Sequence, residues 1–180
     1  NFEIASAVIY EANIRQYSMG GTFSEFTKDL PVLKELGVKI IWLMPINPIS
    51  STKSKGPLGS YYAVSDYKKV NPEFGTEEDF RTLVKKAHDL GIYIILDWVP
   101  GHTGWDHIWI KEHPEFYLKN DKGEITDPIN HATGKSWGWT DVADLDYNNK
   151  RMKKAMSNAM KYWIEEFDID GYRVDQAYAV

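Results

Sequence analysis

Residues Ile92–Val99 read "IYIILDWV", an apolar run that is broken by a single acidic residue, Asp97. A near-continuous apolar run of this length is typical of a parallel strand that is buried on both faces. The segment before it has helical spacing of its apolar residues, an N-terminal capping signal at Thr76 and a stop at Gly91. The stretch therefore predicts a helix that leads into a buried parallel strand.

The same strand–helix unit recurs along the chain. Residues 5–12 and 38–45 read as strands, a helix is predicted from Thr22, and a further helix precedes a strand at 169–175. Pro31 interrupts the first helical pattern, which predicts a kink or a later start. Repeated strand–helix–strand units with right-handed crossovers predict a parallel sheet. Four such units fit either an open doubly wound sheet or half of an eight-fold barrel.

Composition excludes several classes of function. The formal charge of −5 disfavours a nucleic-acid or anionic-membrane partner. The absence of Cys excludes a disulfide scaffold, a thiolate zinc site and a Cys nucleophile. No apolar run approaches the ~20 residues of a spanning helix, so no membrane partner is expected. No signal peptide is predicted within these residues, and the compartment stays open.

Charged side chains occur where the predicted strands end. Asp97 ends the third strand, and Arg173 and Asp175 end the fourth. A spacing of two puts Arg173 and Asp175 on the same face of a strand. The Arg can then hold the Asp ionised and oriented, as a nucleophile at a sugar C1 requires. A purely structural ion pair explains the same spacing.

The loops after the strands carry candidate binding residues. His102 follows the third strand and would donate a hydrogen bond to a ligand hydroxyl, although a lone loop His more often bonds to backbone. Tyr61, Tyr62 and Tyr67 suit the apolar face of a sugar ring, although loop packing is the commoner role of a single Tyr. The segment 100–147 has no clear period, and a long connection of that kind is uncommon unless it is functional.

In combination and in order, these motifs resemble the α-amylase family of glycoside hydrolases and transglycosidases. "GYRVD" at 171–175 matches the family's strand-four motif, in which the Asp is the nucleophile and the Arg holds it. "DWVPGH" at 97–102 resembles the strand-three motif that ends in a substrate-binding His. "YYAVSDY" leading to "NPEFGT" resembles the loop whose Tyr stacks on the sugar, and the spacing to Asp66 selects Tyr62.

The resemblance implies an α/β fold, a parallel (β/α) barrel of TIM type with about the first four β/α units and a domain-B-like insertion after strand 3. "GWTDVADLDY" at 138–147 resembles the end of that insertion. The expected divisions are 1–99 with strands 1–3, 100–147 as the insertion, and 148–180 with the last helix and strand 4. The family's general acid, a Glu on strand five, and a further Asp on strand seven would lie beyond Val180.

The resemblance further implies a retaining hydrolase or transglycosidase that acts on the α-glucosidic bonds of starch-like α-glucans. The expected partner is an oligo- or polysaccharide α-glucan, and no cofactor is expected for the chemistry. Gly101 stands where the family usually has an Asn that binds structural calcium, which argues against that ion and leaves no expected metal ligand. The expected site residues are two catalytic ones and four substrate-binding ones: Asp175 and Arg173, then Tyr62, His102, Asp97 and Trp105. Among them, Asp97 is also expected to support Arg173.

Two other readings remain. One is a non-catalytic α-glucan-binding relative or subunit of such an enzyme. The other is an unrelated open α/β domain that holds Mg²⁺ between Asp97 and Asp175, although no phosphate-cradling Gly loop follows the first strand. With four strands, the barrel would have open edges, which predicts self-association and no activity for these residues alone.

Overall fold

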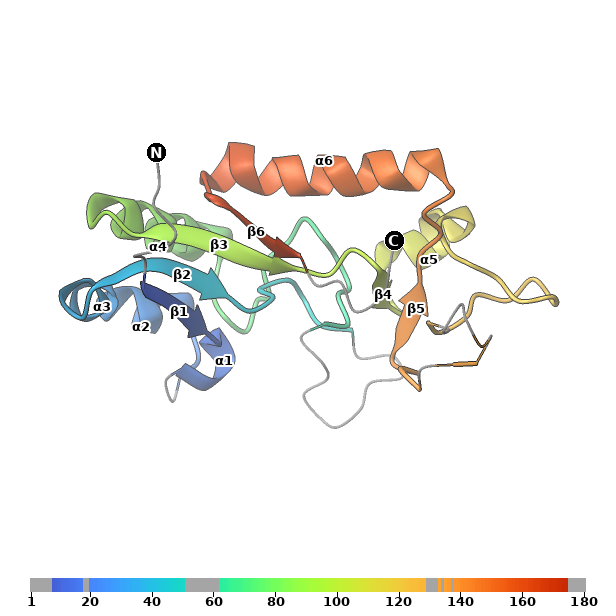
Figure 1. Cartoon of the computed structure of the whole chain (residues 1–180), viewed down its shortest axis with the longest axis horizontal. Helices are drawn as coiled ribbons and strands as arrows, with labels where there is room; N and C mark the ends of the chain where they lie inside the picture. Colours follow the sequence, from blue (N-terminus) through green and yellow to red (C-terminus); the bar gives the residue numbers. More distant parts are fainter. Residues whose placement is uncertain are drawn as a thin grey trace. The chain divides into compact units, whose positions relative to one another are not determined.

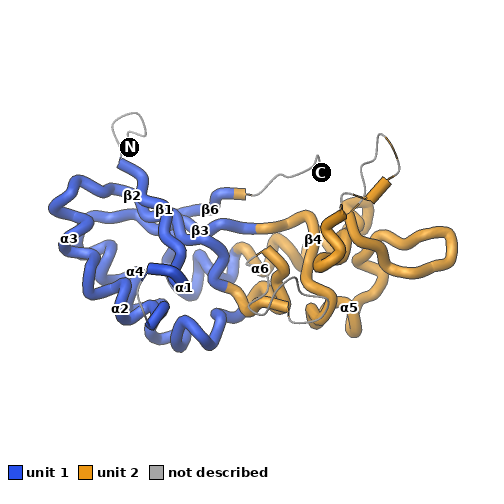
Figure 2. Tube along the Cα trace, turned by 90° about the horizontal axis from the view of Figure 1, so that it is seen from below, with its two compact units in different colours: residues 1–46, 69–98, 161–173 blue, residues 47–68, 99–160, 174–180 orange. Residues whose placement is uncertain are grey.

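The computed structural model of the chain is shown in Figure 1, and it describes residues 8–17, 20–50, 62–128, 133, 135, 136 and 138–174. The chain divides into two compact units, coloured separately in Figure 2. Unit 1 comprises residues 1–46, 69–98 and 161–173, and unit 2 comprises residues 47–68, 99–160 and 174–180. The predicted nucleophile, Asp175, and Tyr61 lie outside the described residues.

Unit 1 is built on a four-stranded sheet in the order β1-β2-β3-β6. β1 pairs with β2 and β2 with β3 in parallel, and the four arrows in Figure 1 point the same way. The predicted parallel sheet is therefore confirmed, with strands somewhat shorter than the apolar runs in the sequence. The strands are β1 (Val8–Ala12), β2 (Val38–Leu43), β3 (Tyr93–Trp98) and β6 (Gly171–Val174).

Short helices follow the first strand, and helices of unit 1 lie on one face of its sheet (Figure 2). The helix predicted from Thr22 is in fact two helices, because Asp29 ends one and begins the next, with Pro31 in the first turn of the second. Pro cannot donate a backbone hydrogen bond, and it is tolerated in a first turn, where that donor is not needed. The helices are α1 (Ile14–Tyr17), α2 (Phe23–Lys28), α3 (Leu30–Glu35) and α4 (Glu77–Asp89).

The predicted start and stop of α4 are confirmed. The Thr76 hydroxyl accepts a hydrogen bond from the Asp79 backbone N–H at 3.1 Å, and the Asp79 carboxylate accepts one from the Thr76 N–H at 2.9 Å. This reciprocal pair satisfies two backbone donors that the helix itself leaves unpaired. At the other end Gly91 has a φ of 74°, a left-handed conformation that glycine adopts without a steric penalty.

The long helix α6 (Lys150–Phe167) runs from unit 2 into unit 1 and leads into β6. Near its end, Trp163 and Phe167 pack on Phe80 of α4, with ring centroids 5.7 and 5.2 Å away. All three side chains are buried, and burial of each large aromatic stabilises the fold by about 2 kcal/mol. No helix in the described part of the chain is long and apolar enough to cross a membrane.

Unit 2 has secondary structure that the sequence pattern did not reveal. Its strands β4 (His102–Gly104) and β5 (Val142–Asp144) pair antiparallel, and between them lie α5 (Ile108–Glu112) and the 3₁₀ helix η2 (Pro114–Phe116). Each element spans three to five residues, too few to show a hydrophobic period. The segment predicted to be without regular structure is thus a set of short elements around a two-stranded sheet.

Gly104 of β4 gives a test of packing in unit 2. A Cβ at this position would lie 2.1 Å from the Ser50 Cβ, so Gly104→Ala forces the backbone apart. We expect the free energy of unfolding to fall by about 3 kcal/mol, measured by urea denaturation. Gly171→Ala is the matched control, because its Cβ would meet only Ile95, at an ordinary 3.7 Å. Equal midpoints for the two variants would contradict this account of Gly104.

Candidate active site

An ion pair with a buried carboxylate lies at the C-terminal ends of two neighbouring strands of unit 1. Asp97, near the end of β3, has a fully buried side chain. Arg173 of β6 directs its Nη1 at both carboxylate oxygens, at 3.1 and 3.3 Å. A buried ionised carboxylate is costly unless it is paired and hydrogen-bonded, so Arg173 compensates the charge of Asp97. The structure thus brings together two of the predicted site residues that are 76 positions apart.

The guanidinium of Arg173 has a second neighbour, on β2. Its central carbon lies 5.0 Å from the ring centroid of Trp42, within the range of a cation–π contact. Trp42, Asp97 and Arg173 come from three different strands of one sheet. The sequence analysis missed Trp42, because a Trp in an apolar strand indicates only packing until its neighbours in space are known.

Strand alternation explains why these three residues meet. Trp98 of β3 and Tyr172 of β6 contact each other with centroids 5.2 Å apart, and each directly adjoins a member of the ion pair. Successive side chains point to opposite faces of a sheet, so Asp97 and Arg173 share the other face. Burial raises the pKa of Tyr172, which therefore stays neutral. Asp175 lies two positions beyond Arg173 and outside the described residues.

In unit 2, Tyr67 fixes the segment that leads into the predicted substrate-binding His102. Its hydroxyl donates toward two carbonyl oxygens, those of Val99 at 2.7 Å and of His102 at 3.0 Å. Tyr67 is itself buried. Of the two loop tyrosines that the structure describes, Tyr67 therefore has a structural role, while the side chain of Tyr62 is only half-buried.

A buried histidine that the sequence analysis did not single out packs on Tyr67. His107 has its ring 5.0 Å from that of Tyr67 and 4.9 Å from that of Trp109. Its Nδ1 accepts a hydrogen bond from the Trp109 N–H at 3.1 Å and so caps α5. Its buried Nε2 has no hydrogen-bond partner within the described residues. Burial lowers the pKa of His107 to about 3, outweighing the opposite effect of Asp106, so the ring is neutral at ordinary pH.

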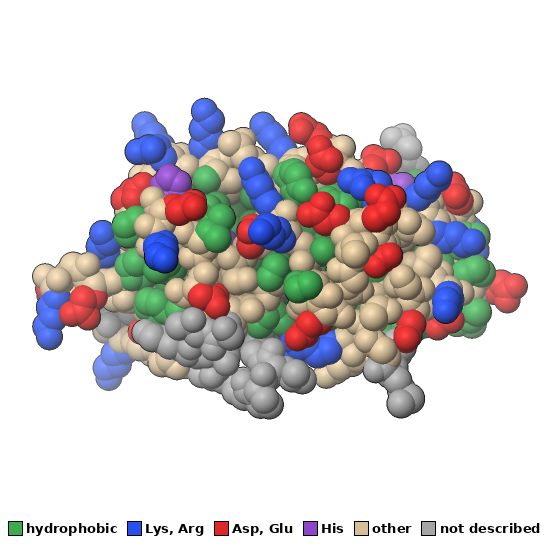
Figure 3. All heavy atoms as spheres, turned by 180° about the vertical axis from the view of Figure 1, so that it is seen from behind, with side chains coloured by type: hydrophobic (Ala, Val, Ile, Leu, Met, Phe, Trp, Pro, Cys, Tyr) green, Lys and Arg blue, Asp and Glu red, His purple; other side chains and the backbone are tan. Residues whose placement is uncertain are grey.

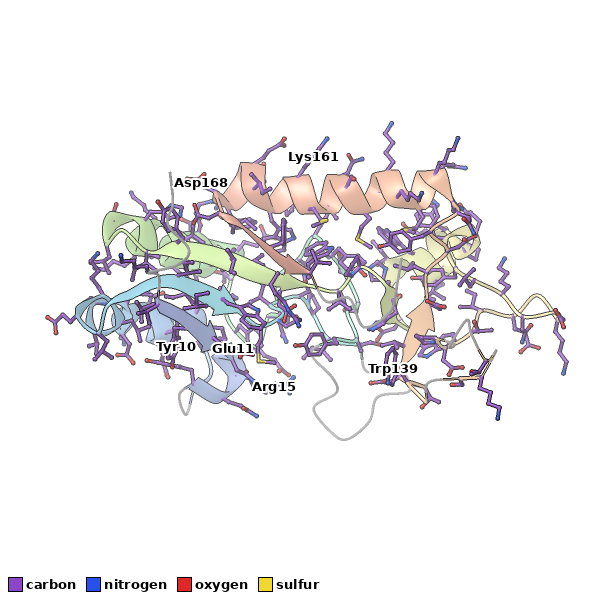
Figure 4. The ribbon with its side chains drawn as sticks, in the orientation of Figure 1. Tyr10, Glu11, Arg15, Trp139, Lys161 and Asp168 are labelled. Carbon is purple, nitrogen blue, oxygen red and sulfur yellow. The ribbon has the colours of Figure 1, made fainter. Side chains whose placement is uncertain are left out.

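Two tryptophans lie near His102 within unit 2. The ring centroid of Trp139 lies 6.3 Å from that of His102. Trp139, which is labelled in Figure 4, precedes β5 in the chain. The indole N–H of Trp105 donates to the Thr140 carbonyl at 2.9 Å. This bond joins the chain after β4 to the chain before β5, and it gives Trp105 a structural contact in addition to its predicted role.

Another charged cluster lies at the opposite ends of β3 and β6. The Asp170 carboxylate accepts the Ile94 N–H at 2.8 Å and lies 2.7 Å from Nε2 of His88. Asp168, labelled in Figure 4, lies 3.7 Å from Nδ1 of the same His. Residues at this end of parallel strands usually serve stability, and these bonds tie β6 to β3 and α4.

Metal ligands do not converge in the part of the chain that the structure describes. No group of three or more His, Asp or Glu residues there could hold a metal ion. Gly101 contributes only its backbone, whose carbonyl accepts the Leu145 N–H at 3.1 Å. On the face of the molecule in Figure 3, acidic and basic side chains are interspersed.

Parallel strands with a polar site at their C-terminal ends place the chain among the α/β enzyme-type domains. The family model described as "Alpha amylase, catalytic domain" matches residues 10–180. The chain belongs to the α-amylase family, as its motifs suggested. This membership excludes an unrelated open α/β domain.

Individual relatives agree with the family match. Alpha-amylase 3 of Dictyoglomus thermophilum is 30% identical, and the match covers 96% of this chain and 36% of the relative. The crystal structure of an α-amylase from Lactobacillus plantarum superposes with a TM-score of 0.89 at 41% identity, covering 97% of this chain and 39% of that one. An α-amylase from Geobacillus thermoleovorans, solved with acarbose, gives a TM-score of 0.76 at 32% identity, covering 95% and 40%.

The chain therefore spans less than half the length of these relatives. Their catalytic domains imply that the parallel sheet of unit 1 is a portion of a TIM-type barrel. The relatives are enzymes, which disfavours a role limited to glucan binding.

His107 makes the stability of unit 2 depend on pH. Its pKa is about 3 in the folded protein and 6.5 when exposed. Its contribution to the free energy of unfolding is therefore complete above pH 6.5 and is lost as the pH falls toward 3. His107→Asn keeps a cap acceptor but does not titrate. Between pH 7 and pH 4, we expect the free energy of unfolding of the wild type to fall by about 3 kcal/mol relative to that of His107→Asn. Urea denaturation at each pH measures it, and a difference that does not change with pH would contradict the burial of a neutral ring.

Proposed function

We propose that this chain supplies the nucleophile-bearing part of a retaining α-glucan hydrolase or transglycosidase. The observation that carries the proposal is the ion pair between Asp97 and Arg173 at the C-terminal ends of β3 and β6. It positions a cation two residues before Asp175, on the strand that carries the "GYRVD" motif. Membership of the α-amylase family supports the same chemistry.

Each site residue has a distinct proposed role. Asp175 attacks C1 of the sugar and forms a glycosyl-enzyme intermediate, which water or an acceptor sugar then releases. Arg173 keeps Asp175 ionised and oriented, and Asp97 holds Arg173 in place. A Glu outside these residues protonates the leaving oxygen and later activates the attacking water or acceptor. The release of the leaving group and the attack on the intermediate thus use one acid–base group.

The sugar at the cleavage point is held by residues of unit 2. His102 donates to a sugar hydroxyl, Tyr62 stacks on the ring, and Trp105 borders the same site. The bonds from Tyr67 to the His102 and Val99 carbonyls support this role, because they fix the backbone that carries the histidine. The proposed substrate is a starch-like α-glucan, which agrees with a structural neighbour solved with acarbose.

The finer architecture follows the same proposal. The sheet of unit 1 corresponds to strands 1–4 of an eight-stranded barrel, and residues 100–147 correspond to domain B, with 1–99 before it and 148–180 after it. No cofactor takes part in the chemistry. Gly101 has no side-chain ligand where the family usually has an Asn, which argues against a structural calcium ion at this position.

The nucleophile is tested by Asp175→Ala in a protein of the relatives' full length. Loss of the attacking carboxylate is expected to lower kcat on maltooligosaccharides by about a thousandfold or more, with folding retained. Asp89→Ala is the control, because Asp89 is exposed at the end of α4. Near-normal turnover by Asp175→Ala, with the circular dichroism of both variants unchanged, would overturn the assignment.

Residues 1–180 on their own give a further prediction. We expect no hydrolysis of maltooligosaccharides, because the general acid is absent, and we expect self-association. Val8, Ile9 and Tyr93 on the strands of unit 1 are 48%, 51% and 42% exposed, and exposed apolar strands favour pairing between chains. Sedimentation velocity measures the association, and a monomer at all concentrations would contradict it.

A further inference from the structure

The side chain that holds the guanidinium of Arg173 from its second side is Trp42. We propose that Trp42 is a positioning residue for the glycosidic reaction: its indole face fixes the guanidinium of Arg173, whose Nη1 atom donates to Asp97. This inference rests on the proposed function, because it assigns a role to a neighbour of the same site.

The first observation is the geometry of the contact. The guanidinium carbon lies 5.0 Å from the indole centroid, and Nη1 of the same group reaches both oxygens of Asp97. Trp is the strongest π partner for a cation, and Arg is the cation most often found over it. Because the Arg173 side chain is still 40% exposed, the ion pair by itself leaves the guanidinium partly open to water.

The second observation is how the sheet produces the contact. Trp42 is level with Ile95 in the pairing of β2 and β3, so it lies two positions before Asp97 along the strands. β2 and β6 lie on opposite sides of β3, so their side chains that point to the same face can meet over β3. In TIM-type barrels, side chains from alternate strands fill one layer of the interior. The contact between Trp42 of β2 and Arg173 of β6 likewise joins alternate strands.

The third observation concerns the indole nitrogen of Trp42. Nε1 of Trp42 is buried and has no hydrogen-bond partner among the residues that the structure describes. Replacement of Trp42 by Phe therefore removes no hydrogen bond that is seen here. It keeps an aromatic ring but offers the cation a weaker face, while Leu offers none.

The substitutions are made in a protein of the relatives' full length. We expect kcat to fall about tenfold in Trp42→Leu and by a smaller factor in Trp42→Phe, with KM nearly unchanged. The acidic limb of the pH profile of kcat/KM is expected to move to higher pH, further in Trp42→Leu than in Trp42→Phe. A loosely held guanidinium stabilises an ionised carboxylate less, whereas a simple packing defect would leave this limb in place. Tyr93→Leu is the control, since it removes an aromatic ring from the N-terminal end of β3 and is expected to leave kcat and the acidic limb unchanged.

A second measurement does not depend on activity. The Nε–Hε NMR signal of Arg173 in ¹⁵N-arginine-labelled protein, assigned with Arg173→Lys, feels the ring current of Trp42. We expect it to shift in Trp42→Leu and to stay in place in Tyr93→Leu. If the signal shifts but the parent protein has no glycosidase activity, the proposed function fails and the contact stands. If the parent is active and the acidic limb does not move in Trp42→Leu, the inference about Trp42 is overturned, whether or not the signal shifts.

Discussion

The site depends on one buried charge. The carboxylate of Asp97 is wholly removed from solvent at the end of a central strand, where an unpaired ion would cost several kcal/mol. The guanidinium of Arg173 compensates that cost and is itself fixed in place by doing so. Because the pair joins β3 to β6, the same interaction holds two strands in register and orients a cation at the C-terminal edge of the sheet, where parallel folds place their chemistry.

Around this pair the sheet sorts its side chains by face. Trp98 and Tyr172 pack together on one side, while their neighbours Asp97 and Arg173 meet on the other. The apolar side is covered by helices and by the aromatic contacts between α4 and α6, so it can be read as an ordinary core. On the other side Arg173 compensates the charge of Asp97, and Trp42 adds an aromatic surface beside the cation.

Unit 2 fixes the proposed binding residues in a different way. Apart from the start of α6, its described strands and helices are short. Its order comes from side chains that bond to backbone, such as Tyr67 to the Val99 and His102 carbonyls and Trp105 to the chain before β5. The buried, neutral His107 completes an aromatic cluster with Tyr67 and Trp109. A loop held by such contacts can present a histidine with little conformational freedom, which suits the recognition of a sugar hydroxyl.

The sequence by itself determined the parallel strands, the capping of α4 and the motifs of the α-amylase family, because these depend on local periodicity and on short spacings. It placed charge at the strand ends, and the family resemblance led to the expectation that Asp97 supports Arg173, but neither gave the geometry of this pair or showed that Trp42 lies beside it. Those contacts join strands far apart in the chain, and only strand order and register decide them. Spacing likewise could not separate the roles of Tyr62 and Tyr67, since which tyrosine is buried depends on how the chain folds back on itself.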